Sequence, residues 1–285
     1  MSGKKKRMGG RAERHKLRSA SMPVDKRPVR PGHFGGRYQP LTASEIKQIH
    51  SAVLETLETI GIADAIPSQI NLLTAAGAIV DSEGRLRFPR ALVEDTIAAA
   101  ARNIVLFGQE ERHDLELSKE RVYFGTAGAA VNLVDAERGE YRDSTILDLY
   151  NAARIVDQME HIHFFQRSMV PRDIEDAREM DFNTCYASVQ GTTKHVGTSF
   201  VLPNHADESI DMLEVIAGGQ QRWQQRPFVS LSCCFVVPPL RFAEDACRVL
   251  ETCVRRGMPI LLLSAGQAGA TSPAALAGSV VQEVA

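Results

Sequence analysis

A unit of about 33 residues recurs in the second half of the chain and restricts the fold more than any other feature. Each unit contains a short apolar run, a polar or glycine-containing loop and an amphipathic helical pattern. The apolar runs begin at Ile162, His195, Phe228 and Ile260, at intervals of 33, 33 and 32 residues. Strands that alternate with helices at this spacing are typical of βαβ units, so the repeat predicts a parallel sheet.

Helices are predicted between these strands over 176–189, 204–217 and 242–256, and another begins near Ser272. Neither nucleotide-binding fingerprint of open α/β sheets, G-x-G-x-x-G or G-x-x-x-x-G-K, occurs, which favours a TIM (β/α)8 barrel. Only four units fit before Ala285, whereas a barrel needs eight. We therefore expect residues 144–285 to form the first half of a barrel in a longer protein. The alternative is an open four-stranded sheet, which would leave a strand edge uncovered.

Residues 41–143 predict an α-rich cap with a β-hairpin. Thr42 and Glu45 form a capping box at the start of an apolar pattern with helical spacing, and Gly61 ends that helix. The following elements are a short helix over 70–76, a strand over 86–88, a helix over 89–102 and two strands within 121–142. The small-residue loop Gly125–Gly128 lies before the second of these strands, and it either packs tightly under the hairpin or contacts a ligand.

The formal net charge of −2 hides a strong asymmetry. Residues 1–30 carry 11 Lys or Arg and 2 acidic residues, whereas the remainder carries 22 basic and 33 acidic residues. Proline and glycine pairs and the lack of apolar periodicity predict a basic flexible arm over 1–40. No aromatic residues are interleaved with this charge before Phe34, which disfavours nucleic-acid binding and favours an extension over the acidic body or a partner subunit.

Apolar runs such as PILLL at 259–263 are far shorter than the roughly 20 residues of a membrane span. The basic start lacks the hydrophobic part of a secretory signal, so we expect a cytoplasmic protein without a membrane segment. Five cysteines without a C-x-x-C pair indicate thiols rather than a disulfide framework.

Chemistry in α/β sheets and barrels gathers at the carboxyl ends of the strands. Most residues expected there are uncharged. The predicted substrate-binding residues are Gln166, Arg167, Thr198, Phe200, Ser232, Phe235, Ser264 and Gln267. Phe200 and Phe235 are included because aromatic faces can enclose a quaternary ammonium cation. No metal ligands are assigned, and the main catalytic residue is left open.

A cysteine nucleophile with a histidine base could be drawn from Cys233 or Cys234 with His163 or His195. Both histidines lie at the amino-terminal ends of their strands, which disfavours this pairing and a zinc site built from the same residues. Cys247 and Cys253 fall on apolar stripes of the predicted third helix and are expected in the core.

Several longer blocks resemble the trimethylamine:corrinoid methyltransferase family. They are RPVRPGHFGGRYQPLT (27–42), VYFGTAGAAVNLVD (122–135), HFFQRS (163–168), GTTKHVGTSF (191–200), SCCFVVPPLRFAED (232–245) and LLLSAGQAGATSPAALAG (261–278). The resemblance extends through nearly the whole chain. That family has an eight-fold barrel of nearly twice this length, so the resemblance independently implies an amino-terminal half.

The resemblance implies methyl transfer from trimethylamine, or from a quaternary amine such as glycine betaine, to a Co(I) corrinoid. The corrinoid (cobalamin) is carried on a separate cognate protein rather than bound directly, and a homo-oligomer is expected at full length. Some members carry pyrrolysine in the second half, beyond Ala285, so the subgroup stays open. The rival hypothesis is a non-catalytic binding module that contacts a partner through the cap and the basic arm.

Overall fold

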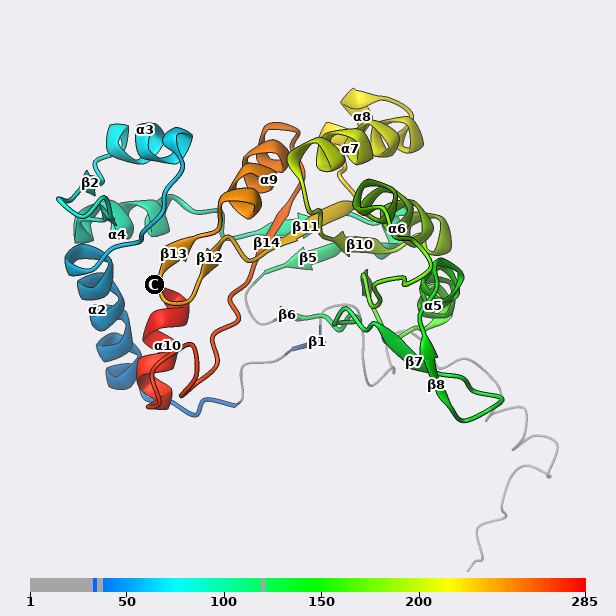
Figure 1. The fold of residues 1–285 in the computed structure, drawn as a ribbon, viewed down its shortest axis with the longest axis horizontal. Coiled ribbons are helices and arrows are strands. Elements are labelled where there is room, and N and C mark those ends of the chain that lie inside the picture. The colour runs from blue at the N-terminus through cyan, green and yellow to red at the C-terminus, as the bar shows by residue number, and fades with distance from the viewer. Residues whose placement is uncertain (1–32, 35–37, 119–120) are drawn as a thin grey trace, which may run out of the picture.

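The computed structural model describes residues 33–34, 38–118 and 121–285 (Figure 1). Most of the predicted basic arm, 1–40, therefore lies outside the described residues. The described part is a mixed α/β structure with a four-stranded parallel sheet. Its strands are β9 (Phe164–Gln166), β10 (His195–Thr198), β11 (Val229–Cys233) and β14 (Ile260–Leu262), side by side in chain order. The prediction of a parallel sheet is confirmed.

Helices cover one face of this sheet along its whole width (Figure 1). They are α5 (Ile146–Gln158), α6 (Ala177–Gly191), α7 (Pro203–Ala217), α8 (Gln220–Gln225) and α9 (Glu244–Arg255). Val196, Val229 and Leu231 point into this layer and are almost completely buried against α6, α7 and α9. Burying each such side chain contributes about 1.5–3 kcal/mol, so this layer holds the sheet together. None of the helices in the described ranges is both long and apolar enough to cross a bilayer.

A helical cap precedes the sheet. It comprises α2 (Ala43–Thr59), α3 (Pro67–Ala75), β2 (Ile79–Val80), β3 (Leu86–Arg87) and α4 (Arg90–Ala99). The predicted capping box starts α2, where the side chain of Thr42 accepts a hydrogen bond from Glu45 N and the Glu45 carboxylate accepts one from Thr42 N. Gly61 has a φ of +67°, which confirms the left-handed turn predicted after this helix.

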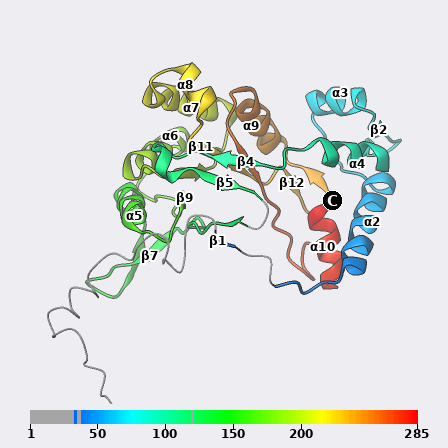
Figure 2. The ribbon, with the colours of Figure 1, turned by 180° about the vertical axis from the view of Figure 1, so that it is seen from behind.

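The cap is joined to the sheet by a hairpin that follows β11. Its strands are β12 (Val236–Val237) and β13 (Arg241–Phe242). Ala63 N donates to Leu240 O at 3.0 Å, and Phe242 N donates to Ala63 O at 2.8 Å. Helix α10 (Leu276–Val284), which follows β14, lies against α2 rather than on the sheet (Figures 1 and 2).

Further short strands form antiparallel pairs. They are β1 (His33–Phe34) with β6 (Arg121–Val122), β4 (Ile104–Leu106) with β5 (Leu115–Leu117), and β7 (Asn132–Val134) with β8 (Tyr141–Asp143). The last pair is the predicted hairpin. The β4–β5 hairpin was not predicted, and the loop between its strands, which contains the 3-10 turn Glu111–His113, reaches the start of β10. There Gln109 N donates to Thr193 O at 2.8 Å.

Candidate functional site

The two faces of the parallel sheet differ sharply in polarity. Successive residues of a strand point to opposite faces. Val196 of β10 and Leu231 of β11 pack among the helices, so His195, Gly197, Ser230 and Ser232 share the other face. That face corresponds to the interior of the predicted barrel, and its side chains are joined in two cross-strand pairs.

The lower pair lies near the start of the strands. His195 Nδ1 is 2.8 Å from Phe107 O, and Nε2 is 3.0 Å from Ser230 Oγ. A carbonyl oxygen only accepts, so Nδ1 carries the proton and Nε2 accepts the hydrogen bond of the Ser230 hydroxyl. Burial lowers the pKa of His195 to about 4, which keeps this ring neutral near pH 7. His195 therefore fastens the β4–β5 loop to the sheet, in keeping with its predicted place at the amino-terminal end.

The upper pair lies at the carboxyl ends and contains two predicted site residues. Ser232 Oγ donates to Gln166 Oε1 at 3.2 Å, although Gln166 is on β9 and Ser232 is on β11. The Gln166 side chain thus passes over β10 at Gly197. The Gln166 carbonyl accepts a hydrogen bond from Thr126 Oγ1 at 2.6 Å. Both side chains are half-buried, so a small molecule on this face can reach an amide and a hydroxyl.

Arg167 lies beside this pair but points to the helix side. Its guanidinium donates to Ser199 Oγ at 2.7 Å, and burial lowers its pKa, opposed by Asp181. Thr198 and Phe200 are likewise buried on the helix side, Phe200 within the cluster formed with α6, α7 and α9. The structure does not bring Thr198 or Phe200 to the face that carries Gln166.

Phe235 and Ser264 lie together, away from the Gln166–Ser232 pair. Both line a cavity of about 250 Å³ between the end of β14 and α10. Ser264 Oγ donates to the Glu283 carboxylate, which also accepts from Gly266 N. Gln267 is exposed, and its backbone closes the turn before Thr271. The predicted residues therefore separate into several locations instead of one cleft.

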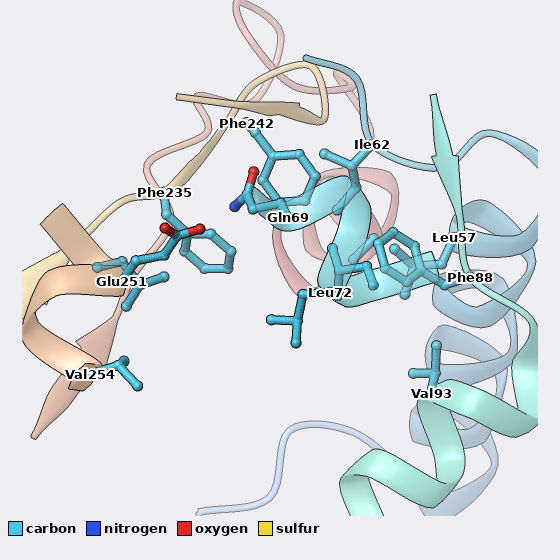
Figure 3. Close-up of a pocket in the computed structure, with 13 residues that line it drawn as sticks. Leu57, Ile62, Gln69, Leu72, Phe88, Val93, Phe235, Phe242, Glu251 and Val254 are labelled. Atoms are coloured by element: carbon cyan, nitrogen blue, oxygen red, sulfur yellow. The ribbon is translucent and has the colours of Figure 1, made fainter. Parts of the chain in front are cut away.

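A second cavity, of about 400 Å³, lies between the cap and α9 (Figure 3). Figure 3 shows the rings of Phe235 and Phe242 at its upper side, and their centroids are 6.2 Å apart. Its two polar side chains already have partners, since Gln69 Oε1 accepts from Ile66 N and the Glu251 carboxylate accepts from Ser68 Oγ. The lining therefore offers apolar contacts, and both of its polar side chains are already engaged in hydrogen bonds.

The cysteines lie in the core or close to it. Cys247 and Cys253 are fully buried, as predicted from the helical pattern. Cys233 points into the helix layer, and burial raises the pKa of its thiol to about 11. Burial also raises the pKa of Cys234. Thiols with raised pKa values are poor nucleophiles, so the structure favours the core interpretation.

The Gly125–Gly128 loop packs tightly at its first residue. A Cβ at Gly125 would overlap the ring of Phe164, the first residue of β9. This contact supports the packing interpretation of the loop.

A buried Asp–His contact that the sequence did not reveal fixes the loop after β10. Asp181 Oδ2 is 2.8 Å from His205 Nδ1 and accepts from Val201 N at 2.7 Å. Asp181 lies five residues into α6 and His205 lies in the first turn of α7. In the sequence, Asp181 lies on one predicted helix and His205 at the start of the next. Nothing else indicated this contact, because it depends on how the two helices pack.

Known proteins resemble the chain over most of its length. The family described as Trimethylamine methyltransferase (MTTB) matches residues 7–285. Trimethylamine methyltransferase MttB of Desulfitobacterium hafniense (strain DSM 10664 / DCB-2) is 31% identical over 238 residues. MttB2 of Methanosarcina mazei is 26% identical over 245 residues, and the glycine betaine methyltransferase of D. hafniense (strain Y51) is 23% identical over 250.

These matches cover 83%, 84% and 87% of this chain but only 48%, 49% and 51% of the respective relatives. The chain thus spans about half the length of the curated relatives it matches. Because the family match covers almost all residues, membership does not depend on any single motif. The chain belongs to the trimethylamine methyltransferase (MTTB) family.

Proposed function

We propose that the chain forms part of an enzyme that transfers a methyl group from a methylated amine to a corrinoid protein. The methyl donor is a tertiary or quaternary amine, in line with the names of the relatives. The observation that carries the proposal is the family match over residues 7–285, together with the uncharged polar pair at the carboxyl ends of the strands.

We propose that the four βα units are half of an eight-fold barrel. The strands follow each other in chain order, all parallel, with α6, α7 and α9 on one face, which is the arrangement of barrel units, whereas α10 after the fourth strand lies against α2. In that proposal residues 144–285 form the half-barrel, 41–143 form the cap, and Gln166 and Ser232 line the mouth. The other predicted residues lie elsewhere: Arg167, Thr198 and Phe200 are on the helix side, Phe235 and Ser264 line the cavity beside α10, and Gln267 is in an exposed turn.

The corrinoid, carried by the partner protein, would supply a nucleophilic Co(I) centre. What this chain must do is bind the amine, orient its methyl group and exclude water. The Gln166 amide and Ser232 hydroxyl are neutral groups that can orient a small substrate without competing for the methyl group. The described residues at this edge provide no titrating nucleophile, since the nearby thiols have raised pKa values. A homo-oligomer and a cytoplasmic location stay predictions.

The test is a methyl-transfer assay. Reduced cognate corrinoid protein is mixed with the chain and a panel of donors that includes trimethylamine and glycine betaine, and methylcobalamin formation is followed by absorbance. We expect Gln166→Ala to lower kcat/KM about 10–100-fold, because misplacing a substrate costs about this factor. Gln220→Ala, on the exposed surface of α8, is the matched control. Absence of transfer from every donor, by the chain alone and by the chain extended to the length of its relatives, contradicts the proposal.

A further inference from the structure

Gln166 reaches an unusually distant partner. Neighbouring strands lie about 4.8 Å apart, so β9 and β11 are separated by about 9.6 Å. The Gln166 side chain spans this gap and accepts the hydrogen bond of Ser232 at 3.2 Å. It can do so only if it lies nearly flat on the sheet. Nothing can project from β10 beneath it.

Gly197 is the β10 residue beneath that side chain. Gly197 pairs with Gln166 in the register of β9 and β10. A Cβ at position 197 would overlap Gln166 Oε1, and it would lie 2.8 Å from Gln166 Cδ and 3.3 Å from Nε2. These are its three nearest atoms, and all belong to Gln166. Glycine in a strand interior weakens the strand, and Gly197 is not among the glycines with positive φ. Backbone conformation therefore does not explain its presence.

Two contacts fix Gln166 once it lies across Gly197. Thr126 Oγ1 holds its backbone carbonyl, and Ser232 Oγ holds its side-chain carbonyl. Within the described ranges, no residue accepts a hydrogen bond from Gln166 Nε2. The amide is thus held at its oxygen, and its N–H donors stay available.

The geometry points to Gly197 as a positioning residue that holds the Gln166 amide across β10 for the substrate. This inference rests on the proposed function only for the identity of that substrate. The structural part of the inference is that any side chain at position 197 displaces the Gln166 side chain and breaks its hydrogen bond with Ser232. The fold should tolerate the change, because the displaced atoms are the far end of a flexible side chain.

The first test observes the Gln166 side-chain amide by NMR in the 285-residue chain, with Gln166→Ala to assign the signal. Gly197→Ala should move both amide proton shifts to the values of exposed glutamines, and Ser232→Ala should move them in the same direction. Ser230→Ala, on the same strand and face but bonded to His195, should leave them in place. Unchanged shifts in Gly197→Ala overturn the inference.

The second test is a double-mutant cycle on the urea denaturation midpoint. If Gln166 is what Gly197 accommodates, Gly197→Ala should lower the midpoint in the native background and leave it unchanged or raise it in the Gln166→Ala background. If Gly197→Ala lowers the midpoint equally in both backgrounds, the inference is overturned. This criterion also holds if Gly197→Ala alone destabilises the fold, because the comparison is between the two backgrounds. In methyl transfer, each single variant and the double variant should lose the same factor in kcat/KM, about 10–100-fold. Additive losses contradict the positioning role. If the wild type transfers no methyl group, the NMR shifts and the denaturation midpoints still test whether Gly197 positions Gln166.

Discussion

Neutral His195 should make the protein lose stability as the pH falls below 6.5. Burial lowers the folded-state pKa of His195 from 6.5 to about 4, so the unfolded chain binds the proton first. Between these values the unfolded state holds more protons, and stability declines with falling pH. Above pH 6.5 the contribution is complete. A separation of about 2.5 pH units, at about 1.4 kcal/mol per unit, corresponds to about 3–4 kcal/mol.

The assay is urea unfolding followed by circular dichroism from pH 7.5 to 4.5, for the wild type and His195→Asn. Asparagine can still donate to Phe107 O, but it does not titrate. We expect the wild type to lose about 2–3 kcal/mol more than His195→Asn over this range. His113 has its pKa lowered by burial as well, so His113→Asn is measured as a control. Parallel pH profiles for the wild type and His195→Asn would refute the reasoning.

Three further outcomes are expected. Lys194→Met should destabilise the protein by about 3 kcal/mol in urea unfolding, because the Lys194 ammonium donates to three backbone carbonyls at the end of α5 and just beyond it; an exposed lysine changed to methionine is the control. Gly191→Ala should lower the melting temperature by several degrees, because its Cβ would lie 2.8 Å from a carbonyl of α5; an unchanged melting temperature contradicts this packing. Half-buried Cys234 should react with a thiol reagent before Cys185 and Cys253, whose pKa values burial raises to about 12, as mass spectrometry of peptides can check. Equal rates for the three thiols would contradict the burial pattern.

The sequence was sufficient for the sheet and its helices because both signals are local. Apolar runs at a fixed interval located β9, β10, β11 and β14 within a few residues, and the Thr42 capping box located the start of α2. Helix α5 was not predicted, although it has a capping box of the same kind at Thr145 and Asp148. The β4–β5 hairpin was missed because strands of three residues are too short to show alternation, and docking onto Thr193 stabilises them.

The candidate site was harder to predict because the sequence of a strand does not show which of its side chains point to which face of the sheet. Every second residue points to the same side, so neighbours such as Ser232 and Cys233 cannot share a cleft. The run HVGTSF alternates neither in polarity nor in size, and only the packing of Val196 among the helices shows that Thr198 points away from Gln166. The Gln166 side chain can cross Gly197 to Ser232 only in the observed register of β9, β10 and β11. That register is a property of the three strands together and cannot be read from the sequence of one of them.

The hairpin that joins the cap to the sheet has a consequence for synthesis on the ribosome. Asp64 and Arg241, which pair across this junction, are 177 residues apart in the chain. At about 5–20 residues per second, the cap emerges about 10–35 seconds before its partner. During that time Leu57 on the apolar side of α2, and Ile62 just after this helix, have no Phe242 to cover them. The nascent chain is therefore expected to engage a chaperone at the cap, and a ribosome-bound fragment ending before β12 should be more sensitive to protease than one that includes α9.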